Sequence, residues 1–461
     1  MNSQRSGLTR REMLLGMLAV GGCAQQRHVP PLAELYRDVA PPESTPVLIV
    51  IPGAFGSRLR HRTTGEEIWP GSNLSLIFDN YRDIELKIDP RTLEPVVGDV
   101  EPSGLFVQGL GRDFYGAILR TLENIGGYRL GSLQNPPDSY DRTYYIYDYD
   151  WRLGNVAIAR GLHEFIEGIA EIRHDPGLQV DILAHSNGGL LARYYARYGT
   201  QDVLTTQPVV SSLGGSSRIR RLLLVGTPNL GSMQAVLSHV RGEEIGLRHI
   251  PVEVVATCPG VPQLMPHPGQ NWLVNLRGEP IELDVYDIET WRQLRWSIFS
   301  DEAANRIARY SGSRRAAEAH KEVLQAFLAR SLERGRLFHE SLSATARPDE
   351  PRPYVFGGDC EPTISRLVIE RDGQMYHGHE RAQDIRNPIP GMDYKALINE
   401  PGDTVVTRSS LMGLPRPGEL ENVKPLALSH SVFLCESHQT LTANFSFQDN
   451  LLYTLLHHRE E

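Results

Sequence analysis

Hydrophobic residues along the chain follow two different periods, and segments of the two kinds alternate. Residues 47–51 form an unbroken aliphatic run that Pro52-Gly53 ends, which is typical of a strand buried on both faces. Residues 158–173 instead place their apolar side chains at helical spacing. Further strand-like runs cover residues 144–147, 178–184, 220–226, 354–356 and 428–434, and further helical patterns cover residues 190–198, 316–342 and 448–456. This alternation predicts an α/β fold with a mostly parallel sheet and helices on both faces.

Two long stretches interrupt the alternation. Residues 60–105 are irregular and contain Trp and Pro, whereas residues 232–348 end in a long helical pattern. We expect both to be insertions over one end of the sheet, the first a lid and the second a cap. The remaining chain then forms one α/β domain over residues 47–461. Asp372-Gly373, between two short apolar runs, predicts a β-hairpin turn.

Composition excludes several classes of protein. The 461 residues are 40% hydrophobic and contain 42 glycines, so disordered, collagen-like and multi-span membrane chains are excluded. The net charge of −9 leaves no basic surplus, which argues against a nucleic-acid binder. Four cysteines are too few for a disulfide scaffold, and the sequence leaves open how Cys258, Cys360 and Cys435 pair. His377 and His379 lack a third ligand at motif spacing, so we interpret them as exposed loop histidines and expect neither a metal nor a cofactor.

The first residues are typical of an export signal. Arginines at positions 5, 10 and 11 precede an apolar run of about ten residues, half of the ~20 that span a membrane. Residues 20–23 resemble the bacterial lipobox, in which Cys23 receives a lipid, although an ordinary cleaved signal is the alternative. Residues 9–14 also resemble a twin-arginine signal. We therefore expect residues 1–22 to be removed, Cys23 to anchor the chain to a membrane, and the proline-bearing residues 23–46 to form a stiff tether. Ala24 favours the outer membrane of a bacterial envelope, facing the periplasm.

A candidate nucleophile lies at the end of one predicted strand. Ser186 is placed between the strand-like run 178–184 and the helical run 190–198, on the tight turn of a nucleophile elbow. Gly188 and Gly189 meet the need for small residues where strand and helix nearly touch. The alternative is that Ser186 only caps the helix.

A serine of normal pKa needs a base, and the base needs an orienting carboxylate. In folds with this elbow the chain order is Ser, acid, His. Asp403, on a turn before an apolar run, is the candidate acid, and an Asx-turn aspartate is its alternative. His438 follows a strand-like run and is favoured as the base over His430, which lies inside that run.

Attack on a carbonyl needs backbone amides to stabilise the oxyanion. The Gly-rich turn after residues 47–51 predicts the Ala54 amide as one donor, with Phe55 as the alternative, and Asn187 as the other. Phe55 and Trp151 are candidate walls of a substrate pocket. Trp69 is a candidate contact with acyl chains, although a simple covering of the core explains it equally well.

Several blocks together resemble the lecithin:cholesterol acyltransferase-like family. They are residues 46–59, the Tyr-Asp-Tyr-Asp-Trp-Arg block at 147–152, the Ser186 elbow, the Gly-Thr-Pro block at 226–232 and residues 402–405. The resemblance implies an α/β-hydrolase fold with lid and cap, a Ser-Asp-His triad that cleaves acyl esters of lipids, and oxyanion donors at Ala54 and Asn187. The chain departs from the family where Gly402-Asp403-Thr404 lacks the second glycine of Gly-Asp-Gly-Thr. Residues 60–105 also lack the lid cysteines of the animal enzymes.

The expected protein is a lipid-anchored serine hydrolase of the bacterial envelope that acts on lipid acyl esters. Water as the second nucleophile would make it a lipase or phospholipase, and an alcohol would make it an acyltransferase. The alternative is a non-catalytic envelope lipoprotein that uses the fold as a lipid-binding scaffold. The sequence does not indicate the chain length of the substrate or the oligomeric state.

Overall fold

The computed structural model divides the chain into two units, residues 1–39 and residues 40–461, of which the first contains the short helix α2 (Leu32–Leu35). The predicted export signal, the lipidation site Cys23 and most of the tether lie outside the described residues. The structure describes residues 31–37, 39, 46–71, 81–96, 98–109, 112–136, 142–205, 211–245, 248–373, 375–420 and 423–456.

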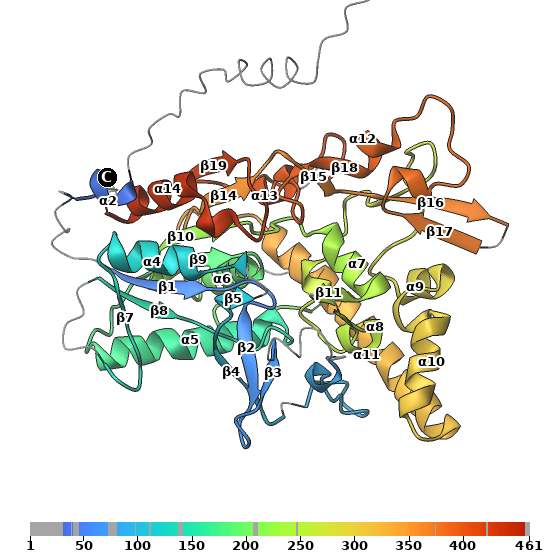
Figure 1. The fold of residues 1–461 in the computed structure, drawn as a ribbon, viewed down its shortest axis with the longest axis horizontal. Helices are drawn as coiled ribbons and strands as arrows, with labels where there is room; N and C mark the ends of the chain where they lie inside the picture. The colour runs from blue at the N-terminus through green and yellow to red at the C-terminus, as the bar shows by residue number, and fades with distance from the viewer. Residues whose placement is uncertain are drawn as a thin grey trace, which may run out of the picture. The chain divides into compact units, whose positions relative to one another are not determined.

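Seven parallel strands form the central sheet of the second unit, in the order β19-β14-β10-β9-β1-β8-β7 (Figure 1). All five residues of β1 are buried, as the aliphatic run predicted. Because the strands are parallel, the loops that follow them meet at one edge of the sheet. The predicted α/β class is confirmed. The strands are β1 (Val47–Ile51), β7 (Arg129–Leu130), β8 (Thr143–Ile146), β9 (Val180–His185), β10 (Ile219–Val225), β14 (Tyr354–Gly358) and β19 (His430–Leu434).

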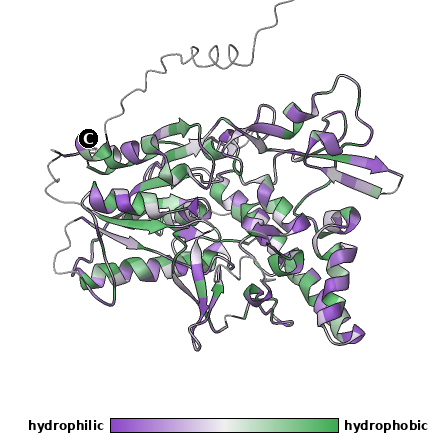
Figure 2. Cartoon of the chain, viewed as in Figure 1, coloured by the Kyte–Doolittle hydropathy of each residue, from purple (hydrophilic) through white to green (hydrophobic). Residues whose placement is uncertain are grey.

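Helices cover both faces of this sheet. Helix α5 packs against α6, and α4 packs against α14 on the opposite face (Figure 1). In Figure 2 these helices alternate hydrophobic and hydrophilic residues, whereas the inner strands are mostly hydrophobic. None of the described helices is both long and apolar enough to cross a membrane. The helices are α4 (Gly116–Asn124), α5 (Asn155–Ile172), α6 (Asn187–Tyr198), η2 (Ser216–Arg218), η6 (Leu441–Ala443) and α14 (Phe445–Leu456).

A small antiparallel sheet, β3-β2-β4, follows β1 and falls within the predicted lid. Its inward side chains Leu59 and Trp69 join the main hydrophobic core, so this segment covers the core as well as the sheet edge. The elements are β2 (Ser57–His61), β3 (Glu67–Trp69), η1 (Arg82–Ile84), β4 (Val100–Leu105), β5 (Gln108–Gly109) and β6 (Arg112–Asp113).

The segment predicted as a cap is mainly helical. Its long helix α11 spans Arg314–Ser343 and packs against α9 and α10, and it matches the predicted pattern at 316–342. The elements are α7 (Met233–Arg241), β11 (Glu243–Ile245), β12 (Arg248–Ile250), α8 (Val252–Val255), η3 (Pro262–Leu264), β13 (Leu273–Val274), α9 (Ile288–Leu294), η4 (Ser297–Phe299), α10 (Asp301–Tyr310) and α11.

A third insertion, between β14 and β19, was not predicted apart from its hairpin. Strands β16 and β17 pair antiparallel with Asp372 opposite Met375, which agrees with the predicted turn at Asp372-Gly373. The interpretation of His377 and His379 as exposed loop residues is wrong. Both lie on β17, and buried His379 contacts Glu370 at 2.9 Å, because the pairing of β17 with β16 turns it inward. The elements are β15 (Glu361–Ile364), β16 (Leu367–Asp372), β17 (Met375–His379), η5 (Ala382–Asp384), α12 (Tyr394–Ile398), β18 (Asn399–Gly402) and α13 (Arg408–Met412).

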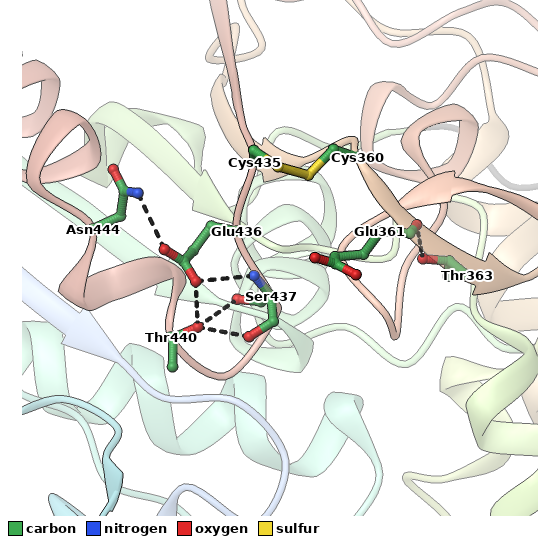
Figure 3. The surroundings of a disulfide bond; sticks show 8 residues. All are labelled: Cys360, Glu361, Thr363, Cys435, Glu436, Ser437, Thr440 and Asn444. Carbon is green, nitrogen blue, oxygen red and sulfur yellow. Dashed lines mark hydrogen bonds between the residues drawn. A yellow bond between two sulfur atoms is a disulfide. The ribbon is translucent and has the colours of Figure 1, made fainter. Parts of the chain in front are cut away.

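A disulfide joins Cys360 to Cys435, at the ends of the paired strands β14 and β19 (Figure 3). The loop that leaves Cys435 is held by Glu436, whose carboxylate accepts hydrogen bonds from the Thr440 hydroxyl at 2.6 Å and the Asn444 amide at 3.2 Å. Cys258 is a free buried thiol. The disulfide therefore fixes the start of the loop after β19.

Removal of this disulfide should destabilise the fold. Cys360→Ser/Cys435→Ser opens a crosslink between positions 75 residues apart, and we expect a loss of about 2–4 kcal/mol in the free energy of unfolding. Denaturation by guanidinium measures this change in the free energy of unfolding. Reductant should lower the midpoint of the wild-type protein and leave that of the double variant unchanged. An unchanged midpoint for the reduced wild type would contradict the prediction.

Candidate active site

Ser186 lies on a strained turn between β9 and α6. Its backbone angles are φ 53° and ψ −122°, in the left-handed region that non-glycine residues rarely occupy. A Cβ on Gly188 would lie 2.6 Å from the Pro52 carbonyl oxygen, and one on Gly189 would lie 1.9 Å from the Thr227 hydroxyl oxygen. Gly188 thus allows α6 to approach the turn after β1, and Gly189 allows it to approach the segment after β10. The conformation is that of the predicted nucleophile elbow.

The structure brings Ser186, His438 and Asp403 together. Nε2 of His438 lies 3.1 Å from Oγ of Ser186, and Nδ1 of His438 lies 2.8 Å from Oδ2 of Asp403. His438 comes from the loop after β19 and Asp403 from the turn after β18, and both are buried. His430, the alternative base, is an exposed residue at the start of β19. Position therefore favours His438 as the partner of Ser186.

The carboxylate of Asp403 is oriented by its own turn. Oδ1 accepts hydrogen bonds from the amides of Val405 at 3.0 Å and Val406 at 2.7 Å, which leaves Oδ2 for His438. Thr404 occupies the position where the family has its second glycine, and its φ is 81°. The Thr404 amide donates to the Thr363 hydroxyl at 2.9 Å, so a hydrogen bond holds a conformation that glycine would adopt freely.

Two backbone amides face the same cavity as Ser186. Asn187 is the first residue of α6, so its amide has no acceptor inside the helix and carries the positive end of the helix dipole. Ala54 lies in the turn after β1, and within the described part of the chain its amide donates to no other protein group. Ala54 and Asn187 both line the cavity, as the predicted oxyanion donors should. The alternative donor Phe55 lies beside them, with φ 62°.

Tyr149 connects the two segments that carry these amides. Its hydroxyl donates to the Pro52 carbonyl at 2.9 Å and accepts a hydrogen bond from the side chain of Asn187 at 3.2 Å. Asn155 donates to the other end of the Asn187 side chain at 3.1 Å. The Asn187 side chain is therefore held between Tyr149 and Asn155. Tyr149 belongs to the Tyr-Asp-Tyr-Asp-Trp-Arg block at residues 147–152.

His185 and Tyr115 form a second connection that sequence reasoning missed. Nε2 of His185 lies 3.3 Å from the His438 carbonyl oxygen, which requires a proton on Nε2. Nδ1 then accepts the hydroxyl proton of Tyr115 at 2.9 Å, and the Tyr115 oxygen accepts the Gly53 amide at 2.9 Å. Burial, together with the neighbouring charge of His438, lowers the pKa of His185 to about 3, so it stays neutral. This chain of hydrogen bonds links the turn after β1 to the loop after β19 that carries His438.

A cavity of about 740 Å³ opens over Ser186, His438 and the two amides. Phe55, Trp69 and Trp151 form an aromatic cluster on one side, with ring centroids 4.4–5.4 Å apart. Trp69 and Trp151 are buried, and their ring nitrogens donate to the carbonyls of Phe55 and Ser57. The three predicted substrate-binding residues thus lie at the cavity as a rigid apolar wall. In the described part of the chain no group of three or more His, Cys, Asp or Glu side chains could hold a metal ion.

Comparison with known proteins supports the resemblance seen in the sequence. The profile described as "LCAT: Lecithin:cholesterol acyltransferase" matches residues 139–293, which include Ser186 and the block at 147–152. This similarity supports, in general terms, an enzyme that acts on acyl esters of lipids. A comparison with curated proteins found no match.

Solved structures share the fold at low sequence identity. "The crystal structure of Tle4-Tli4 complex" matches with a TM-score of 0.53 and 15% identity over 89% of this chain and 98% of that chain. The Bacillus licheniformis lipase BlEst2 in mature form has a TM-score of 0.34 and 12% identity, over 90% of this chain and 94% of its own. EstA from Clostridium botulinum has a TM-score of 0.34 and 13% identity, over 93% of this chain and 91% of its own. The first of these supports the α/β-hydrolase fold.

Loss of the Tyr115 hydroxyl should impair the nucleophile without unfolding the protein. Tyr115→Phe removes the hydrogen-bond partner of the Gly53 amide and of Nδ1 of His185. We expect the activation free energy of the reaction at Ser186 to rise by about 1–3 kcal/mol, so labelling of Ser186 by a fluorophosphonate should be roughly 5- to 150-fold slower. Tyr194→Phe is the matched control, since the Tyr194 hydroxyl donates to the carbonyl of Gln201, which follows the C-terminal end of α6. Equal labelling rates for the two variants would show that Tyr115 has no such role.

Proposed function

Because residues 139–293 are similar to the lecithin:cholesterol acyltransferase family, we propose that this protein cleaves acyl esters of lipids through an acyl-serine intermediate. The observation that carries the proposal is the hydrogen-bonded series from Ser186 through His438 to Asp403. Ser186 and His438 line a largely apolar cavity at the edge of a parallel sheet. The series has the geometry of a nucleophile, a base and the carboxylate that orients the base.

In the proposed reaction, Oγ of Ser186 attacks the ester carbonyl carbon while Nε2 of His438 takes the hydroxyl proton. Asp403 accepts a hydrogen bond from the Nδ1–H group, remains ionised, and stabilises the imidazolium that forms. The amides of Ala54 and Asn187 stabilise the negative charge on the carbonyl oxygen. The carbon–oxygen bond to the alcohol then breaks, and His438 returns its proton to the leaving oxygen. The acyl group remains on Ser186.

A second nucleophile completes the cycle by the same steps in reverse. Water would release a fatty acid, and an alcohol would receive the acyl group as a new ester. The aromatic side of the cavity, formed by Phe55, Trp69 and Trp151, is the proposed site of the acyl chain, since its rings bury apolar surface.

The proposed place of action is the bacterial envelope, with the chain held to a membrane through lipidated Cys23. The lipobox-like residues 20–23 and the arginine-bearing signal support this proposal. The disulfide between Cys360 and Cys435 agrees with it, because disulfides persist mainly in oxidising compartments such as the periplasm.

Substitution of the candidate triad tests the chemistry. Ser186→Ala should lower turnover of a long-chain ester by about 10⁴- to 10⁶-fold and should abolish fluorophosphonate labelling. His438→Ala should lower turnover comparably, whereas His430→Ala should retain most of it. Product identification with and without an alcohol acceptor separates hydrolysis from transfer. A folded wild-type protein that neither turns over esters nor becomes labelled would support the non-catalytic scaffold instead.

Substitution of Cys23 tests the anchor. Cys23→Ala should move the protein from the membrane fraction to the soluble fraction of bacterial cells, because no diacylglyceryl group can be attached. Fractionation followed by immunodetection measures the shift, and metabolic labelling with a fatty acid should mark the wild-type chain alone. Persistence of the variant in the membrane fraction would refute the anchor at this residue.

A further inference from the structure

One side of the catalytic cavity is polar, in contrast to its aromatic side. Gln234 and Ser238 lie four residues apart and therefore on one face of α7, and both line the cavity. Glu243 of β11 lines it beside them. Acyl chains need no such groups, so this side suits the alcohol part of an ester.

The hydrogen bonds around Glu243 engage one of its two carboxyl oxygens, Oε2. Oγ of Ser238 lies 2.8 Å from the Gln234 carbonyl oxygen and 2.5 Å from Oε2 of Glu243. A hydroxyl has one proton, and the carbonyl can only accept. Ser238 therefore donates either to that carbonyl or to Oε2 of Glu243, and Oε2 also accepts the side-chain amide of Gln234 at 3.5 Å.

The surroundings of Glu243 shift its carboxyl group toward the neutral form. Burial raises the pKa of its carboxyl group, and the bond from Ser238 and the charge of Arg241 oppose the shift without cancelling it. Arg241 forms its ion pair with Glu380. Arg112, which also lines the cavity, donates to Gln439 at 3.0 Å. Within the described part of the chain, Glu243 forms no ion pair and its Oε1 has no hydrogen-bond partner.

We propose that Oε1 of Glu243 accepts a hydrogen bond from a free hydroxyl group on the alcohol part of the substrate. The preferred substrates are then esters of polyols, such as partial acylglycerols or sugar esters, with the acyl chain on the aromatic side. A neutral acceptor suits a hydroxyl better than an ammonium group, since an ammonium gains most from a full negative charge. The inference rests on the proposed function, because it assigns the substrate of the same cavity.

The test compares three esters of one acyl chain, which differ only in the alcohol. The methyl ester has no donor, the 1-monoacylglycerol has two hydroxyl groups, and the acylcholine has a cation without a hydroxyl. Glu243→Leu should lower kcat/KM for the monoacylglycerol about threefold to tenfold and should leave that for the methyl ester nearly unchanged. Glu243→Gln should retain most of the activity on the monoacylglycerol, since an amide also offers a neutral acceptor. Glu289→Gln, on α9 and in an ion pair with Arg292, is the control and should change neither kcat/KM value.

Two outcomes would overturn the inference. Equal losses on the methyl ester and the monoacylglycerol would mean that Glu243 only ties β11 to α7. A preference for the acylcholine that Glu243→Gln removes would mean that the cavity recognises a positive charge. Failure of the proposed function is distinguishable from both, because wild-type protein would then hydrolyse none of the three esters and Ser186 would not be labelled.

Discussion

The close approach of the turn after β1 to the first turn of α6 is the constraint on which the site depends. Gly188 permits it, because any side chain there would meet the Pro52 carbonyl. The approach places the Ala54 and Asn187 amides around one cavity beside Ser186. Two tyrosines bridge the segments: Tyr149 joins Pro52 to Asn187, and Tyr115 joins Gly53 to His185. Both contacts are made within the protein, so the donors are oriented before any substrate arrives.

The cavity combines parts of the chain with different roles. The segment after β1 supplies a rigid aromatic side, and the helical cap supplies the polar side through α7 and β11. The central sheet supplies only the ends of its strands. Under the proposed function, the insertions contact the substrate, while Ser186 and His438 follow strands of the sheet and Asp403 comes from the third insertion.

Sequence reasoning reached those features that depend on local pattern. The aliphatic run of β1, the stripe on α5 and the elbow at Ser186 each follow from periodicity or from the need for small neighbours. The Asp403 turn and the choice of His438 over His430 came from chain order and strand position. The geometry favours both.

Features that depend on contacts between residues far apart in the sequence could not be predicted. His185 is adjacent to Ser186, but its partner Tyr115 lies 70 residues away, and no spacing rule joins them. Cys258 and Cys435 were equally good candidate partners for Cys360 until the pairing of β14 with β19 was known. His379 looked like a loop residue because β17 has too few apolar positions to show a strand period. The proposed role of Glu243 could be inferred only from its hydrogen bonds to α7 in the structure.

The conformation of Thr404 shows that the third insertion does more than pack against the rest of the chain. A glycine at this position would let the Asp403 turn form from backbone freedom alone, whereas here the turn depends on the hydroxyl of Thr363 in β15. Residues 361–402, which look like a peripheral elaboration, therefore act as an outer brace for the acid.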